Sequence, residues 1–281
     1  MIDVVMCAYN SESTIREAVD SVLNQTYRDF KLWVFNDNSQ DSTLEILKQY
    51  DDERLVILSS SKNIGTYAAK NFALKNVGVG KYLALHDADD ISHPERFEKQ
   101  IRFMEKNDVA CLGTAVKEFW EGDWFPHTIS IEIVENNERV NKYAKKIKRG
   151  ELKSVLTHLT NDYDKYIKFK FCMNGTVMFR KSILYKLGGW DGEARVGGDT
   201  DLFIRILGEE DIHNLSECLY YRRFHKNSLT ANPETGINSS FRKEYNIKRK
   251  DVIAASLSGA PVVRDLYYPN DFSCKVITCA V

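Results

Sequence analysis

Short apolar runs alternate with helix-like segments over the first 110 residues, and this alternation constrains the fold more than any other feature. The first apolar run is Val4–Cys7, and apolar residues then recur at helical spacing from Ile15 to Leu23, with Thr14 and Glu17 spaced as a capping box for this helix. Further strands are expected at 31–35, 55–58 and 82–86, and further helices at 43–50, 63–74 and 92–104. Strand–helix alternation of this kind predicts an α/β fold with a mainly parallel sheet flanked by helices.

Polar turns follow three of these four expected strands. They are Ala8–Asn10, Asn36–Ser39 and Asp87–Asp90. Ligands of open parallel sheets bind outside the carboxyl ends of the strands, where such turns meet. We therefore expect one ligand site built from these three turns.

The second half of the chain is less regular. Strands are expected at 111–119, 175–180 and 218–224, and helices at 182–187 and 199–207. Residues 120–172 have no clear periodicity, and their basic run 139–153 fits either a solvated helix face or a contact with an anionic partner. A basic, helix-like stretch follows at 241–253.

Composition excludes several classes of protein. The chain has 281 residues and a net charge of −1, which argues against nucleic acid as a partner. No apolar run approaches the roughly 20 residues of a membrane span, and the first residues lack a signal-peptide pattern. The six cysteines form no CxxC pair, so we expect free thiols and a cytoplasmic protein, free or peripheral at a membrane.

The cluster Asp87-Ala88-Asp89-Asp90 is the feature most closely tied to chemistry. Three acidic side chains within four residues repel one another, and a shared divalent cation would relieve that repulsion. Oxygen ligands suit Mg²⁺ or Mn²⁺, which often complete their shells with substrate phosphates. A solvated turn in which Asp90 caps a helix is the structural alternative. No phosphate-binding glycine loop, dinucleotide motif, hydrolase elbow or zinc spacing occurs.

Four motifs in order resemble the inverting glycosyltransferases of family 2, which have the GT-A fold. They are Val4–Asn10 with Ser21–Tyr27, then Phe35–Thr43, then Asn63–Asn71 with Asp87–Pro94, and finally Gly188–Asp191 with Gly198–Arg205. The segment Tyr221–Thr230 is similar as well, so the resemblance covers about residues 2–230. It implies a mainly parallel central sheet with a smaller mixed sheet on the acceptor side.

The resemblance also implies a site for a nucleotide-sugar donor. Ala8, Tyr9 and Asn10 would contact the base and ribose, and Asp37 would accept a hydrogen bond from the base, which favours uracil. Lys70 would lie near the diphosphate or the ribose. Asp87 would hold the ribose. The donor-binding residues implied are Ala8, Tyr9, Asn10, Asp37, Lys70, Asp87 and Ala88. Asn36 and Asn38 depart from the family's usual Asp and Gly, which bears on base selectivity.

Metal and base roles come from the same resemblance. Asp89 and His225 would bind Mn²⁺ or Mg²⁺, although an isolated histidine after a strand is also often structural. Asp199 would be the general base, although an aspartate at a helix start can also be an N-cap. Gly198 stands where the family usually has Glu, which bears on acceptor contacts. Trp190 fits either a core position or stacking on an acceptor sugar.

The expected function is transfer of a sugar from a nucleoside diphosphate, preferably UDP, to a glycan or lipid-linked hydroxyl acceptor. A single displacement needs one base and no covalent partner, so the anomeric configuration would invert. A sugar-1-phosphate nucleotidyltransferase and a non-catalytic binding module are the alternatives. The expected division is a donor half (1–110), an acceptor and base half (111–232) and a helical extension (233–281). Residues 235–281 would pack on the body, mediate a dimer or contact a membrane surface.

Overall fold

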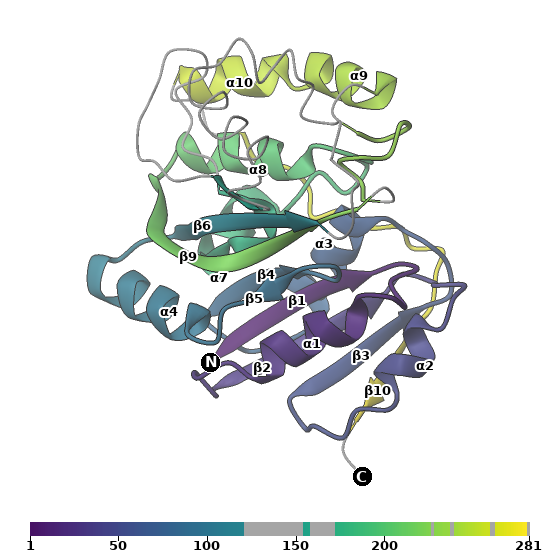
Figure 1. Ribbon diagram of the computed structural model, residues 1–281. Helices are drawn as coiled ribbons and strands as arrows, with labels where there is room; N and C mark the ends of the chain where they lie inside the picture. Colours follow the sequence, from purple (N-terminus) through teal and green to yellow (C-terminus); the bar gives the residue numbers. More distant parts are fainter. Residues whose placement is uncertain (121–153, 158–171, 226–227, 237–238, 259–261, 280–281) are drawn as a thin grey trace.

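The computed structural model describes residues 1–120, 154–157, 172–225, 228–236, 239–258 and 262–279. The described strands form one ten-stranded mixed sheet in the order β10-β3-β2-β1-β4-β8-β6-β9-β5, with β7 paired to β6 (Figure 1). The strands are β1 (Ile2–Ala8), β2 (Phe30–Asn36), β3 (Leu55–Ser60), β4 (Tyr82–Asp87), β5 (Ile91–Ser92), β6 (Cys111–Trp120), β7 (Ser154–Thr157), β8 (Met178–Arg180), β9 (Ile212–Phe224) and β10 (Cys274–Thr278).

Helices cover both faces of this sheet. They are α1 (Ile15–Leu23), α2 (Thr43–Leu47), α3 (Thr66–Asn76), α4 (Arg96–Asn107), α7 (Lys181–Leu187), α8 (Gly198–Leu207), α9 (Ser240–Lys248) and α10 (Lys250–Leu257), with a 3₁₀ turn at Asn174–Thr176. The expected helix 43–50 ends at Leu47, and the basic stretch 241–253 falls within two helices, α9 and α10. The predicted basic run 139–153 lies outside the described residues.

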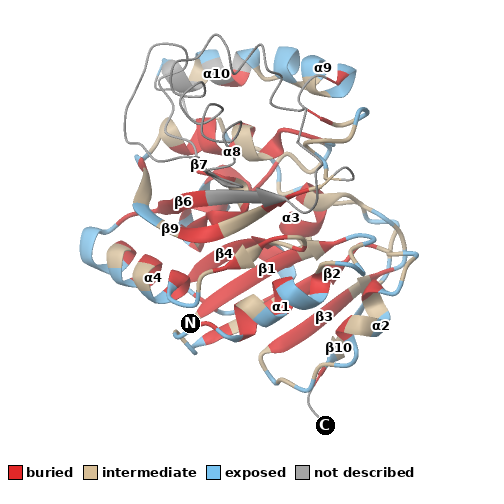
Figure 2. Ribbon diagram, in the orientation of Figure 1, coloured by how far each residue is buried: buried red, intermediate tan, exposed pale blue. Residues whose placement is uncertain are grey.

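The parallel half of the sheet is the one that the sequence predicts. β1 pairs in parallel with β2 and with β4, and β2 pairs in parallel with β3. Alternate residues of β1 enter two cores: Val4 and Met6 pack with α1 and α4, while Val5 packs on the face of α3, α7 and α8. A strand buried on both faces must be apolar throughout, which explains the continuous run Val4–Cys7 (Figure 2).

The second half adds antiparallel pairing. β8 pairs antiparallel with both β4 and β6, while β6 runs parallel to β9 with an irregular register near Ala115. The expected strand 218–224 is the end of a longer strand that starts at Ile212. β10, which the sequence analysis did not predict, returns from the C-terminal region to pair antiparallel with β3.

One local expectation is wrong. Thr14 makes no capping bond for α1; its hydroxyl instead donates to the carbonyl oxygen of Ala88 at 3.0 Å. Of the two alternatives for Trp190, the structure confirms the core position, because its side chain is fully buried and packs edge-on against Phe179, with 5.9 Å between the ring centroids. The six cysteines are free thiols, as expected.

Candidate active site

The carboxyl ends of β1, β2 and β4 meet at one edge of the sheet, as predicted. Ala8 on β1 pairs with Asn36 on β2, and Cys7 pairs with Asp87 on β4. Beyond β1 and β2 the turns bind each other: the N–H of Asn10 donates to Oγ of Ser39 at 3.1 Å. Tyr9 stands at the surface of this edge with half of its side chain exposed.

Asp37 fixes the turn that leads into α3. Its Oδ1 accepts the N–H of Ile64 at 2.8 Å, and its Oδ2 accepts the N–H of Gly65 at 2.9 Å. Burial raises the pKa of Asp37, and these two backbone hydrogen bonds oppose that rise because they favour the charged form. Asp37 therefore already supports the local fold, and only its remaining lone pairs are available to a ligand.

The acidic loop after β4 is held by Arg223 of β9. The N–H of Arg223 donates to Oδ1 of Asp90 at 2.7 Å, its Nε donates to the carbonyl oxygen of Asp89 at 3.1 Å, and its guanidinium group pairs with Glu17 of α1. Asp90 is buried and does not cap α4, whose N-cap is Glu95. Burial raises the pKa of Asp90 well above its usual range.

Asp89 faces His225. The Oδ2 atom of Asp89 lies 2.8 Å from Nε2 of His225, and both side chains remain partly exposed. A carboxylate and an imidazole that converge on one point suit Mn²⁺. Among the described residues no group of three or more His, Cys, Asp or Glu side chains could hold a metal ion. These two residues fit an ion that takes its other ligands from a phosphorylated substrate and water.

Several charged side chains act on Asp87. Burial raises its pKa, and the negative charges of Asp89 and Asp199 raise it further, while the cation of Lys70 lowers it. Lys70 lies on α3 and is almost fully buried, with Nζ 5.4 Å from the ring centroid of Tyr67. Gly175 leaves the space that Asp87 needs, since a Cβ there would lie 2.8 Å from Oδ2 of Asp87.

Asp199 is the second residue of α8, whose N-cap is Gly197, so Asp199 is not itself the cap. Its Oδ1 lies 3.3 Å from the hydroxyl oxygen of the buried Tyr67 on α3. Burial and the charge of Asp199 keep the pKa of Tyr67 well above its usual value, so the phenol stays protonated and donates to the carboxylate. Tyr67 thereby fixes the carboxylate of Asp199 at the start of α8, and the charge of this carboxylate reaches Asp87.

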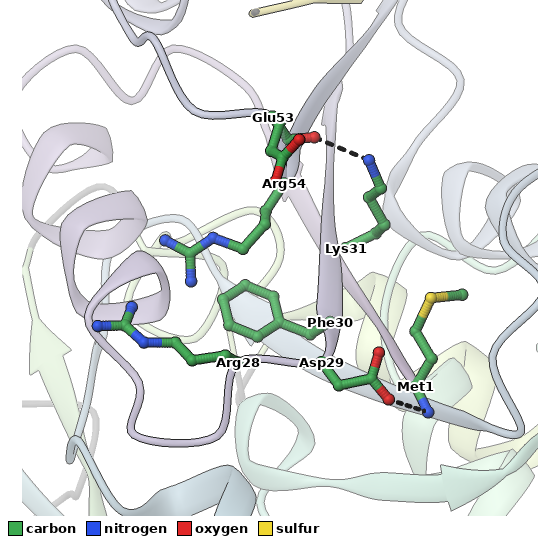
Figure 3. A pocket seen from close by; sticks show the side chains of 7 residues that line it. All are labelled: Met1, Arg28, Asp29, Phe30, Lys31, Glu53 and Arg54. Atoms are coloured by element: carbon green, nitrogen blue, oxygen red, sulfur yellow. Dashed lines mark hydrogen bonds and ion pairs between the residues drawn. The ribbon is translucent and has the colours of Figure 1, made fainter.

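A hollow at the opposite end of the strands is unrelated to this site. It has a volume of about 530 Å³ and is lined by Met1, Arg28, Asp29, Phe30, Lys31, Glu53 and Arg54 (Figure 3). The amino group of Met1 lies 2.8 Å from Oδ2 of Asp29 there, and Nζ of Lys31 donates to the carbonyl oxygen of Glu53.

Comparison with known proteins decides the family. Residues 3–188 match the description "Glycosyl transferase family 2". The chain belongs to glycosyl transferase family 2. An uncharacterized glycosyltransferase of Methanocaldococcus jannaschii is 40% identical over 75% of this chain and 66% of its own length. A UDP-Glc:alpha-D-GlcNAc-diphosphoundecaprenol beta-1,3-glucosyltransferase of Escherichia coli, WfgD, is 33% identical over 51% of each chain. This family 2 chain thus spans about half to two thirds of these relatives.

Solved structures agree with the fold. The crystal structure of S. aureus TarS 1–349 in complex with UDP-GlcNAc matches with a TM-score of 0.59 at 16% identity, over 92% of this chain and 72% of that one. A mannosyltransferase from Pyrobaculum calidifontis in complex with GDP-Man and Mn²⁺ matches with a TM-score of 0.57 at 14% identity, over 92% and 69%. The predicted GT-A fold and the glycosyltransferase class are therefore confirmed.

Three residues outside the predicted set help to hold this candidate site together. Tyr67, Gly175 and Arg223 contact the predicted residues but were not singled out. Arg223 did stand in the segment similar to the family, and this was the available signal. Of the predicted donor residues, Ala8 and Ala88 are buried, so only their backbone atoms could contact a donor.

Proposed function

We propose that this chain is an inverting, metal-dependent glycosyltransferase that moves a sugar from a UDP-sugar to a glycan or lipid-linked hydroxyl acceptor. One observation carries the proposal: Tyr67 of α3 holds the carboxylate of Asp199 at the start of α8, at 3.3 Å, and the negative charge of that carboxylate reaches Asp87 at the end of β4. We take the space between these carboxylates to be the reaction site. The sugar–diphosphate bond would lie in that space. The WfgD relative, named for a UDP-Glc donor and a diphosphoundecaprenol acceptor, supports the choice of substrate classes.

The residues then divide the work. Tyr9, Asn10 and Asp37 contact the nucleoside, together with backbone atoms of Ala8 and Ala88. Lys70, beside Asp87, places a buried cation near the diphosphate. Bound at Asp89 and His225, Mn²⁺ or Mg²⁺ would supply positive charge that stabilises the departing diphosphate.

Asp199 takes the proton from the acceptor hydroxyl as that oxygen attacks the anomeric carbon. The bond between this carbon and the diphosphate oxygen breaks in the same displacement, and the electron pair leaves with UDP. The hydrogen bond from the hydroxyl group of Tyr67 holds the carboxylate of Asp199 in position. Attack on the face opposite the leaving group inverts the configuration.

Nucleotide binding tests the donor assignment directly. UDP, GDP, ADP and CDP are each titrated into the protein with and without Mn²⁺, and the thermal unfolding midpoint is recorded. A ligand that binds the native state raises this midpoint as its concentration exceeds Kd. We expect the largest rise in the unfolding midpoint with UDP and Mn²⁺ together. We also expect the protein to release UDP from a UDP-sugar. The proposal would be contradicted if all four nucleotides raised the unfolding midpoint equally, or if no nucleotide raised it in the presence of Mn²⁺.

We also propose that exposed side chains of α9 contact a membrane surface. Ile247 is 63% exposed and Phe241 40%, and Lys248 and Lys250 are exposed near Ile247. Apolar and basic side chains together on an exposed helix are typical of helices that lie on anionic bilayers. Within the described residues no helix is long and apolar enough to cross a membrane. Tyr245 packs α9 on the body, and Phe241, one turn earlier on the same side, lies at the edge of that contact with Arg195 over its ring.

A further inference from the structure

Two arginine side chains at α9 each have one buried nitrogen atom without an acceptor. Arg242 lies on α9 and Arg249 directly follows it; both are partly buried, and the Nε atom of each is shielded from solvent and has no hydrogen-bond acceptor among the described residues. A buried donor left without an acceptor is destabilising, and more so when it is charged. The two residues are seven positions apart, so they lie on the same side of the helix. An anionic ligand would supply the missing acceptors.

Packing places this pair beside the first turn of α8. Tyr245, between the two arginines in sequence, has its hydroxyl 2.9 Å from Oδ2 of Asp191. A Cβ built on Gly197 would lie 3.0 Å from Cδ1 of Tyr245 and 3.7 Å from Nη1 of Arg249. α9 therefore lies directly over Gly197, two residues before Asp199.

Electrostatic effects agree that the pair is close to Asp199. The charge of Asp199 acts on Arg249, whose pKa is nevertheless lowered overall by burial, and the charge of Arg242 acts on Tyr67, the hydrogen-bond partner of Asp199. The arginine pair is therefore placed by its packing over the start of α8, the helix that carries Asp199.

We propose that Arg242 and Arg249 bind the diphosphate of a phosphorylated acceptor, such as a diphospho-linked lipid. This rests on the proposed function, in which the donor diphosphate occupies the side of Asp89 and Lys70. An anion held by α9 over the start of α8 then belongs to the molecule whose hydroxyl group Asp199 deprotonates. Two guanidinium groups match the two negative charges of a diphosphate diester, and arginine binds phosphate oxygens in a bidentate manner.

The test uses a sugar-free probe, dihexyl diphosphate, titrated by calorimetry into the full chain saturated with UDP and Mn²⁺, so that the donor position is filled. We expect the wild type to bind the probe and Arg242→Gln/Arg249→Gln to weaken binding at least tenfold, with the Kd for UDP unchanged within twofold. The matched control, Lys48→Gln/Lys243→Gln, removes the same charge from two exposed lysines. It should bind the probe like the wild type.

Three results would overturn the inference: no binding of the probe to the wild type, an equal loss in the control variant, or a loss of UDP affinity in place of probe affinity. The last would assign the arginines to the donor diphosphate. If the wild type fails to bind UDP at all, the proposed function fails instead. Titration of the probe into the free protein and the same two variants then still tests the arginine pair.

Discussion

Nε2 of His225 lies 2.8 Å from Oδ2 of Asp89, although 136 positions separate the two residues. The contact joins the loop after β4 to the end of β9, and Arg223 reinforces it from the same strand by donating to the carbonyl oxygen of Asp89. Two side chains of different elements converge here at the one place where the sequence predicted a metal.

Removal of either side chain should uncouple UDP binding from Mn²⁺. Asp89→Asn and His225→Asn are each expected to weaken UDP binding in the presence of Mn²⁺ by tenfold or more, since even second-shell substitutions cost 10–100-fold in metal affinity. UDP binding without metal should change little. Calorimetric titration of UDP at several Mn²⁺ concentrations measures both, with His93→Asn as the control. Unaltered Mn²⁺ dependence in both variants would remove the metal assignment.

Asp199→Asn should lower turnover and leave donor binding intact. A positioned general base contributes about 10²–10⁴-fold, so the rate of UDP release with acceptor present should fall within that range. The amide keeps the size of the side chain and can still contact Tyr67. Asp211→Asn, which alters an exposed aspartate, should retain the wild-type rate. Near-normal turnover in Asp199→Asn would show that another group takes the proton.

The elements that the sequence predicts well are those built from local patterns. The run Val4–Cys7 and the helical spacing from Ile15 to Leu23 each depend on residues close in the chain, and both elements form as expected. The loop Asp87–Asp90 could be predicted because it comes directly after an apolar strand. The strand order could not be read from such patterns, but parallel strands end at one edge, so the site could still be located.

Contacts between distant segments are what the sequence does not disclose. Glu17 pairs with Arg223 across 206 positions, and Tyr67 meets Asp199 across 132. Glu17 was expected to serve a capping box with Thr14, a local interpretation that the tertiary partner overrides. No periodic signal marks such pairs, because each depends on how two elements pack. The same reason explains why β10 was missed.

Arg264 should stabilise the domain through Asp201. Its Nε and Nη2 donate to the two carboxylate oxygens of the fully buried Asp201 at 2.9 and 2.7 Å, and Arg205 binds the same carboxylate. Arg264→Met is expected to lower the free energy of unfolding by about 2 kcal/mol, below the usual 3–5 for a broken buried pair because Arg205 remains. Denaturant unfolding measures this, and the exposed Arg102→Met is the control. Equal stability of the two variants would contradict the assignment.

His86 should make the free energy of unfolding decrease as the pH falls from about 6.5 to about 3. Burial lowers the pKa of His86 from 6.5 to about 3, with the cation of Arg96 adding to the effect. The unfolded chain binds a proton near pH 6.5 and the folded protein only near pH 3, so this contribution is present above pH 6.5 and is lost as the pH falls to about 3. The slope is about 1.4 kcal/mol per pH unit.

His86→Asn should remove this slope. The Nδ1–H of His86 donates to the carbonyl oxygen of Asp87 at 2.8 Å, and the asparagine amide can replace that donor. Unfolding free energies of wild type and variant are compared from pH 7 to 4, and their difference should shift in favour of the variant as the pH falls. The half-buried His213→Asn serves as the control. A difference that stays constant with pH would show that His86 titrates normally.

Membrane binding by α9 is best tested by point substitutions. Deletion of residues 235–281 would also remove the pair of Arg264 with Asp201 and the strand β10, so any loss of binding could reflect unfolding. Phe241→Glu/Ile247→Glu instead places negative charges at the two exposed apolar positions of α9. Sedimentation with anionic phosphatidylglycerol vesicles should show at least a tenfold lower partition coefficient, because each change removes an apolar contact and adds repulsion. Val79→Glu/Val276→Glu alters two other exposed apolar side chains and should bind like the wild type. If both double variants lose binding equally, or if the wild type does not sediment together with the vesicles, α9 is not the membrane contact.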